Sequence, residues 1–214
     1  MENPRRGAFI VVEGLDRSGK TTQVATLKSR LEAEGISATI LKFPDRTTAI
    51  GQMIDSYLRS HSDLDDRAIH LLFSANRWEL ATSIERMLAA GTTVVCDRYA
   101  FSGVAFSSAK GLSLDWCRAP DESLPAPDVT IFLDITPEQA QSRGGYGEER
   151  YEKQEVQRKV RAIFGEISCE FNEETWVTID AGKEREEVAS QVWKIVGPLT
   201  SGLSRPLKRL WHPQ

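Results

Sequence analysis

The segment GLDRSGKT, which begins at Gly14, carries the strongest chemical signal in this chain. It fits the pattern Gly-x-x-x-x-Gly-Lys-[Ser/Thr], follows an apolar run and opens an amphipathic segment. Glycines at this spacing let backbone N–H groups wrap around phosphates, and the helix that follows adds its positive end. Lys20 supplies a point charge for the terminal phosphates, and Thr21 offers a hydroxyl oxygen to Mg²⁺. A glycine-rich turn with a solvated lysine is the alternative. The pattern predicts a nucleoside triphosphate site formed by Gly14, Leu15, Asp16, Arg17, Ser18, Gly19, Lys20, Thr21 and Thr22.

A carboxylate and a guanidinium follow a second apolar run. Asp97 ends the run that starts at Thr93, and Arg98 comes next. In a protein with a phosphate-binding loop, an acid at the end of a strand can orient hydrated Mg²⁺. Asp97 could instead cap a helix. Arg98 could bind a phosphate through two hydrogen bonds, or form an ion pair that holds the loop.

Another arginine comes after the second apolar run. Phe43 and Pro44 end that run, and Arg46 follows two residues later. Open α/β sheets bind ligands at the carboxyl ends of their strands. Arg46 is therefore a second candidate for a substrate phosphate, and a solvated arginine on a turn is the alternative.

An aromatic ring and a guanidinium share one face of a predicted helix. Phe73 and Arg77 are four residues apart, so they project from the same side. The ring suits stacking on a planar base, while the arginine can donate to an edge oxygen. Such a donor favours O4 of thymine or uracil over the amino group of cytosine. The alternatives are a core phenylalanine and a surface arginine. For His70, a packed or surface position is expected rather than a catalytic one.

Two further segments suggest catalysis and closure. Arg17, inside the phosphate loop, could neutralise charge on a transferring group, and Asp16 could contact a sugar hydroxyl. A simple turn pair between the two is the alternative. The segment 143–151 contains three glycines, as a closing lid requires, although a disordered surface loop is also consistent with it.

These residues must be positioned by an α/β fold, because short apolar runs alternate with helical patterns. The expected architecture is a five-stranded parallel sheet flanked by helices in three layers. The expected strands cover 8–13, 38–43, 92–97, 129–135 and 175–180, and the expected helices cover 20–34, 48–60, 67–90, 152–170 and 184–195. Residues 136–139 read as a capping box with an N1 proline. We expect a single domain spanning 1–214, with the tail packing through Leu207, Leu210 and Trp211.

Composition limits the partners. The net charge of −4 and the calculated pI near 5.5 argue against nucleic-acid and anionic-membrane partners. The three cysteines, Cys96, Cys117 and Cys169, are widely spaced, which is typical of reduced thiols. No segment has the apolar length of a signal core or a membrane span. We therefore expect a soluble protein of the cytoplasm, the nucleus or both.

Taken together, the phosphate loop, FPDR, HLLFSANRWE and DRYAFSGVAF strongly resemble the thymidylate kinase family of nucleoside monophosphate kinases. The likeness runs from Arg5 to about Asp180. It implies a P-loop NTPase fold, ATP with Mg²⁺ as phosphoryl donor, dTMP as acceptor and a homodimer. Because an arginine lies in the phosphate loop and the lid interior is rich in glycine and glutamate, the chain is similar to the eukaryotic type.

The resemblance also implies roles for individual residues. Catalysis would involve Arg17, Lys20, Asp97 and Arg98, with Thr21 and Asp97 at the metal. Arg143 would lie against adenine near Ala181. The dTMP site would comprise Asp16 at the 3′-hydroxyl, Arg46 and Arg98 at the phosphate, Phe73 and Arg77 at the base, Phe106 near the sugar 2′ position, and Phe43, Gly103, Tyr151 and Gln157 as further contacts.

Two other functional classes can be weighed against this one. A deoxynucleoside kinase would need a base at the acceptor hydroxyl, whereas Arg46 and Arg98 favour an acceptor that already carries a phosphate. A guanine-nucleotide switch would need N-K-x-D and D-x-x-G segments, and the sequence contains neither in a suitable position. The sequence therefore favours a dTMP kinase, with a related nucleoside monophosphate kinase as the nearest alternative.

Overall fold

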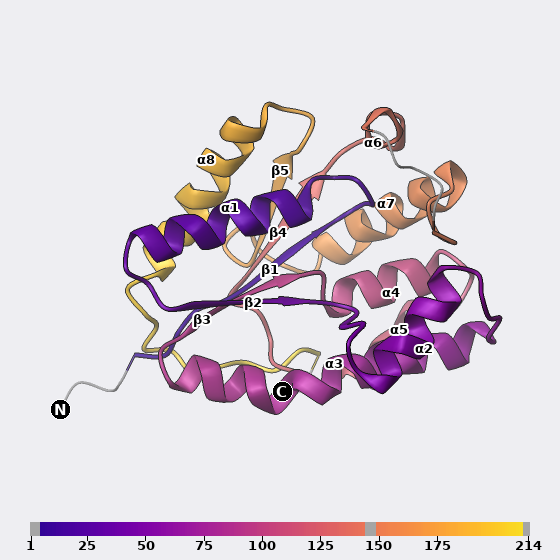
Figure 1. The fold of residues 1–214 in the computed structure, drawn as a ribbon, viewed down its shortest axis with the longest axis horizontal. Coiled ribbons are helices and arrows are strands. Elements are labelled where there is room, and N and C mark those ends of the chain that lie inside the picture. The colour runs from indigo at the N-terminus through magenta and orange to yellow at the C-terminus, as the bar shows by residue number, and fades with distance from the viewer. Residues whose placement is uncertain (1–4, 144–148, 212–214) are drawn as a thin grey trace.

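The structure is a computed structural model that describes residues 5–143 and 149–211. Five parallel strands form one sheet in the order β2-β3-β1-β4-β5 (Figure 1). The strands are β1 (Phe9–Gly14), β2 (Ala38–Lys42), β3 (Thr93–Asp97), β4 (Val129–Asp134) and β5 (Trp176–Asp180). Every predicted strand is confirmed to within one residue at each end, because a strand buried on both faces reads as an unbroken apolar run.

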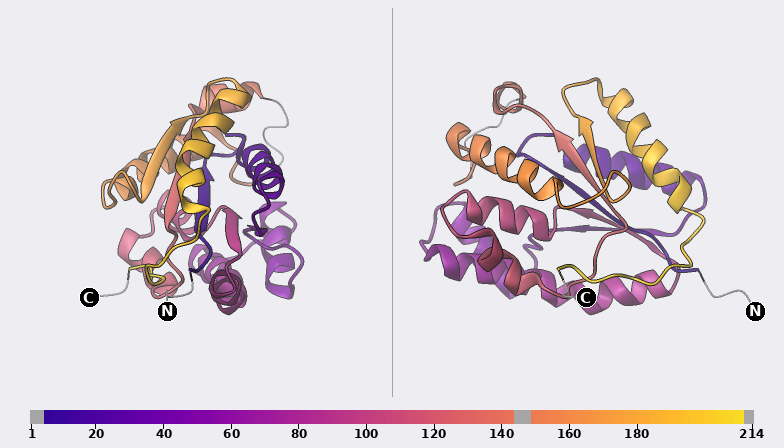
Figure 2. Two further views of the ribbon diagram at one scale, coloured as in Figure 1. Left: turned by 90° about the vertical axis from the view of Figure 1, so that its left-hand side faces the viewer. Right: turned by 180° about the vertical axis from the view of Figure 1, so that it is seen from behind.

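Helices cover both faces of this sheet. They are α1 (Lys20–Ala33), α2 (Ala49–Leu58), α3 (Asp66–Ala89), α4 (Ala100–Ser108), α5 (Leu114–Arg118), α6 (Pro137–Ser142), α7 (Gln154–Ser168) and α8 (Arg185–Val196). Helices α1 and α8 pack together on one face, while α3, α4 and α7 lie on the other (Figure 2). The three-layer α/β fold is therefore confirmed.

Sequence reasoning missed α4 and α5. Helix α4 buries seven of its nine residues, and only Phe106 and Ser108 are more than slightly exposed. A helix that is apolar or small on all sides lacks the amphipathic period that identifies a surface helix. Tertiary burial, rather than a local pattern, decides the conformation of this segment.

Two further sequence expectations concern the start of α6 and the C-terminal tail. The capping box is present, because Thr136 accepts from the Gln139 N–H and the Gln139 side chain accepts in return. In the tail, Leu210 is buried in the main core, and Leu207 and Trp211 pack against it. Both predictions are confirmed.

Strand order brings the chemistry-bearing segments together. Strands β1, β2 and β3 are neighbours, so Gly14, Asp97 and the residues after Lys42 meet at one edge of the sheet. Two backbone hydrogen bonds join these ends, from the Phe43 N–H to the Asp97 carbonyl and from the Arg98 N–H to the Val12 carbonyl, both at 3.0 Å. The ligand-binding edge expected of a parallel sheet therefore carries all three segments.

Candidate active site

The phosphate loop holds its lysine in a cage of oxygens. Lys20 Nζ donates to the carbonyls of Gly14 at 3.1 Å and Leu15 at 2.5 Å, and to Ser18 Oγ at 3.4 Å. Burial, with repulsion from Arg98, lowers the pKa of Lys20 to about 7. A buried lysine at the start of α1 is a strong site for an anion, because phosphate oxygens would stabilise the protonated ammonium form of Lys20.

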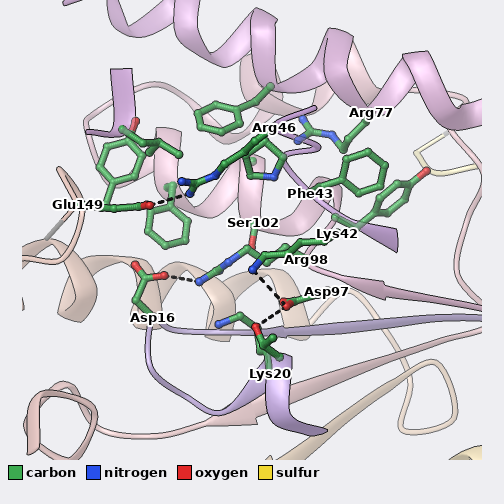
Figure 3. Close-up of a pocket in the computed structure, with 18 of the residues that line it drawn as sticks. Asp16, Lys20, Lys42, Phe43, Arg46, Arg77, Asp97, Arg98, Ser102 and Glu149 are labelled. Carbon is green, nitrogen blue, oxygen red and sulfur yellow. Dashed lines mark hydrogen bonds and ion pairs between the residues drawn. The ribbon is translucent and has the colours of Figure 1, made fainter. Parts of the chain in front are cut away.

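Thr21 and Asp97 place two oxygen atoms side by side next to this loop, and both oxygens are of the kind that Mg²⁺ takes as ligands. Thr21 Oγ1 donates to Asp97 Oδ2 at 2.7 Å, and Lys42 Nζ lies 4.0 Å from the same oxygen (Figure 3). Among residues 5–143 and 149–211, no cluster of three or more His, Cys, Asp or Glu could hold a metal. One carboxylate and one hydroxyl fit Mg²⁺ that arrives with nucleotide phosphates, since such sites use few protein ligands.

Arg98 is both an ion-pair partner and a pocket residue. Its backbone has φ +69°, a left-handed conformation that is uncommon for arginine. Nη1 donates to the Gly14 carbonyl at 2.9 Å and to Ser102 Oγ at 3.1 Å, while Nη2 pairs with the Asp16 carboxylate. The guanidinium therefore faces the phosphate loop, where it could neutralise phosphate charge.

Arg46 reaches the same pocket from the opposite side (Figure 3). It donates to Asp55 Oδ1 at 2.6 Å and to Glu149 Oε1 at 2.7 Å. Asn76 fixes the turn that carries it, because its amide oxygen accepts from the Asp45 N–H at 2.7 Å. A Cβ at Gly51 would lie 1.7 Å from the Asp45 carbonyl oxygen, so the close approach of α2 to this turn requires glycine. Arg46 is thus a held side chain rather than a solvated one.

Arg77 is buried, not on the surface. Its Nε and Nη2 donate to the two oxygens of Asp121 at 3.0 and 2.5 Å. The guanidinium lies against Gly103, where an added Cβ would be only 2.7 Å from Nη2. Phe73 is half-buried and lines the same pocket. The structure brings the predicted ring and guanidinium together in one cavity.

The remaining acceptor-site candidates form a connected wall. Gln157 donates to Asp16 Oδ2 at 2.7 Å and to the Tyr151 carbonyl at 3.0 Å, and it accepts from the Asp16 N–H at 3.1 Å. The rings of Phe106 and Tyr151 pack 5.4 Å apart, and Arg98 lies 5.4 Å above the Phe106 ring. Phe43 lines the same cavity. Nine of the ten predicted dTMP contacts therefore line this cavity, and the tenth, Gln157, bonds Asp16 in its wall.

A second hollow lies beside the first and shares Arg17, Lys20 and Thr21 with it. Arg143 lines it and donates to the carbonyls of Arg17 at 3.2 Å and of Ala181. Thr22 lines it from α1. Arg17 Nε lies 3.3 Å from Glu152 Oε1, so the loop arginine has a carboxylate partner from the segment before α7. Two hollows that share Arg17, Lys20 and Thr21 can hold two anionic ligands end to end, because two of these three side chains are cationic.

Comparison with known proteins agrees with this geometry. The family model described as Thymidylate kinase matches residues 12–192. The thymidylate kinase of Schizosaccharomyces pombe is 52% identical over 198 residues, covering 92% of this chain and 94% of the relative. The chain belongs to the thymidylate kinase family. The thymidylate kinase of Homo sapiens is 44% identical over 209 residues, covering 97% of this chain and 98% of the relative. The solved thymidylate kinase structure from Candida albicans superposes with a TM-score of 0.87 at 38% identity, covering 96% of this chain and 99% of that one.

The thymidylate kinase family assignment confirms the predicted resemblance, fold class and enzyme class. In the described part of the chain, no helix has the length and apolarity needed to cross a membrane. His70 is fully buried, as a packed histidine. The proposed lid falls partly outside the described residues, since 144–148 are not among them.

Sequence reasoning missed the acidic partners of this thymidylate kinase site. Glu13 is fully buried and accepts from the Tyr99 N–H at 2.9 Å, the Ser102 N–H at 3.0 Å and Ser102 Oγ at 2.5 Å, so it holds the loop that carries Arg98. A glutamate inside the apolar run of β1 is a detectable signal, because a charge there must be paired. Asp55, Asp121, Glu149 and Glu152 gave no local signal. Other unpredicted residues that line the acceptor cavity are Lys42, Pro44, Leu58, Tyr99, Ser102 and Ser107.

Proposed function

We propose that this protein transfers the γ-phosphoryl group of ATP to the 5′-phosphate of dTMP, giving ADP and dTDP. The observation that carries the proposal is the pair of hollows that meet at Arg17, Lys20 and Thr21. One of them is lined by several arginines and aromatic rings, among them Arg46, Arg98 and Phe73, as an acceptor with a phosphate and a flat base requires.

The acceptor would lie between the guanidiniums. Arg46 and Arg98 bind the dTMP phosphate and exchange their present carboxylate partners for it. Phe73 stacks on thymine while Arg77 donates to O4. The sugar contacts are Asp16 at the 3′-hydroxyl and Phe106 near the 2′ position, completed by Phe43, Gly103, Tyr151 and Gln157.

The donor would occupy the second hollow. The loop N–H groups and Lys20 bind the ATP phosphates, with Gly14, Leu15, Asp16, Arg17, Ser18, Gly19, Thr21 and Thr22 forming the loop. Arg143, held near Ala181 by its hydrogen bond, packs against adenine. Mg²⁺ bound with ATP at Thr21 and Asp97 would supply positive charge to the phosphates.

Catalysis would then rest on alignment and charge. The acceptor phosphate is already anionic, so the reaction needs no strong base. Lys20 and Arg17 line both hollows and Arg98 lines the first, and together they neutralise charge on the transferring group. A preorganised cationic site stabilises the transition state without reorganising during the reaction.

A coupled assay with ATP tests this proposal. We expect turnover with dTMP, lower turnover with dUMP, and little or none with dCMP or thymidine. Turnover of thymidine but not dTMP would instead indicate a nucleoside kinase. ATP hydrolysis without transfer to any of the four would overturn the proposal.

We also propose a homodimer. Met53, Leu71 and Trp78 are large apolar side chains exposed on α2 and α3, at 50%, 48% and 42%, and exposed apolar groups on neighbouring helices favour a self-complementary contact. Sedimentation of the wild type and of Leu71→Glu checks this, with a monomeric variant expected.

We further propose that residues 1–214 form one domain around one sheet, with 143–151 as a lid. The free thiols of Cys96, Cys117 and Cys169 support the cytoplasm or the nucleus as its compartment.

A further inference from the structure

A buried histidine stands directly behind the base end of the acceptor cavity. His70, on α3, is fully buried. Its Nδ1 lies 2.7 Å from Ser107 Oγ and its Nε2 lies 2.9 Å from the Cys117 carbonyl oxygen. The ring packs against Trp116 with centroids 5.3 Å apart. His70 does not line the cavity, but Ser107 does.

The two hydrogen bonds of His70 fix the position of the Ser107 proton. A carbonyl oxygen can only accept, so Nε2 carries the ring hydrogen. Burial, with repulsion from Arg77, lowers the pKa of His70, which keeps the ring neutral. Nδ1 therefore has a bare lone pair, and the Ser107 hydroxyl donates to it. Toward the cavity, Ser107 Oγ can then only accept.

A hydrogen-bond donor lies on the same wall. Arg77 uses Nε and Nη2 for Asp121, and among residues 5–143 and 149–211 no group accepts from Nη1. The guanidinium lies against Gly103, which precedes Ser107 by four residues on α4 and so shares its helix face. The wall thus offers a donor from Arg77 and an acceptor from Ser107.

We propose that Ser107, oriented by His70, accepts the N3–H of the acceptor base while Arg77 donates to O4. This inference rests on the proposed dTMP site and names how that site selects its base. His70 acts as a positioning residue, and Ser107 as a specificity-determining one.

Cytosine would fail at both positions. Its N3 is an acceptor and would face the Ser107 lone pair, and its 4-amino group is a donor that would face Arg77. A free serine hydroxyl could rotate and donate to N3 instead. His70 removes that freedom, because it holds the only proton of Ser107.

The test compares dTMP with 5-methyl-dCMP, which keeps the methyl group, sugar and phosphate and differs only at N3 and C4. For Ser107→Ala we expect kcat/KM with dTMP to fall about tenfold through KM, since a buried N3–H loses its acceptor. The KM for ATP and the rate with 5-methyl-dCMP should not fall. The matched control is Ser108→Ala. Ser108 is the adjacent hydroxyl on α4 and is not among the residues lining the cavity, so its loss should leave the ratio of kcat/KM for dTMP to that for 5-methyl-dCMP unchanged.

Two changes at His70 separate positioning from packing. In His70→Phe the Ser107 proton is released, so 5-methyl-dCMP should gain activity while dTMP loses it. His70→Asn keeps an oxygen acceptor near the Nδ1 position and should preserve more of the discrimination. If His70 had only a structural role, both variants would lower kcat/KM for dTMP and for 5-methyl-dCMP by the same factor.

An unchanged ratio of dTMP to 5-methyl-dCMP in Ser107→Ala would overturn the inference, and that variant alone decides the matter should His70→Phe fail to fold. The proposed function fails separately, if the wild type does not phosphorylate dTMP at all.

Discussion

Arg77 and Asp121 form a two-bond ion pair in which both side chains are at most 3% exposed. The carboxylate comes from the segment after α5 and holds the guanidinium in the wall of the cavity that Phe73 and Gly103 also line. If Arg77 binds the base as proposed, this pair joins stability to base recognition, because the same arginine faces Gly103 and the cavity.

Breaking this pair from the acidic side should destabilise the fold. In Asp121→Ala the buried Arg77 charge loses its partner, which costs about 3–5 kcal/mol, and the KM for dTMP should rise because the guanidinium is no longer held. Urea denaturation and dTMP kinetics measure the two effects. The double variant Asp121→Leu/Arg77→Met should recover stability but not dTMP affinity. A single variant as stable as the wild type would contradict the expectation.

A methyl group at Gly103 should move Arg77. In Gly103→Ala the new Cβ would lie 2.7 Å from Arg77 Nη2, and Asp121 prevents the guanidinium from yielding freely. We expect the KM for dTMP to rise about tenfold while the KM for ATP stays within about twofold, as for the loss of one hydrogen bond to a charged group. The matched control is Gly165→Ala on α7, where an added Cβ meets nothing within 4 Å. Its activity should be unchanged, and its stability should rise by about 0.5–1 kcal/mol.

The lowered pKa of Lys20, about 7, should make ATP binding depend on pH. Phosphates favour the ammonium form, so the pKa of Lys20 in the complex is higher than in the free protein. Affinity is therefore fully present below about pH 7 and weakens as pH rises above it, until the pKa of the complex is reached. Calorimetry at pH 8 in buffers of different ionisation enthalpy should show proton uptake by Lys20. Phosphate groups, with a pKa of about 6, are already ionised at this pH and do not contribute. Proton release at this pH would be inconsistent with the assignment.

Arg17 should contribute to the chemical step rather than to ATP binding. Its φ of +63° suits glycine, so Arg17→Gly removes the guanidinium without straining the loop. We expect the turnover number to fall by a factor on the order of 10² while the KM for ATP stays within about threefold. Glu152→Gln is the control for its ion-pair partner and should leave a turnover closer to the wild type. An unaltered turnover in Arg17→Gly would exclude this role in the chemical step.

The strands and the cationic site residues were open to prediction because their signals are local. An apolar run marks a buried strand, and the glycine and lysine spacing at 14–21 marks a phosphate loop without reference to the rest of the chain. Parallel pairing then places the ends of neighbouring strands at one edge, so Asp97, Arg98 and Arg46 could be expected near Lys20.

Only the tertiary structure decided which acid holds each arginine. Arg98 and Asp16 are separated by 82 residues, and Arg46 and Glu149 by 103. The chain contains 31 acidic residues, and no local spacing selects among them, because ion pairing depends on distance in space alone. The same reason hid the contact between His70 and Ser107. Residue types and local spacing determined the chemistry available to this protein, while packing of distant segments determined how each group is oriented and charged.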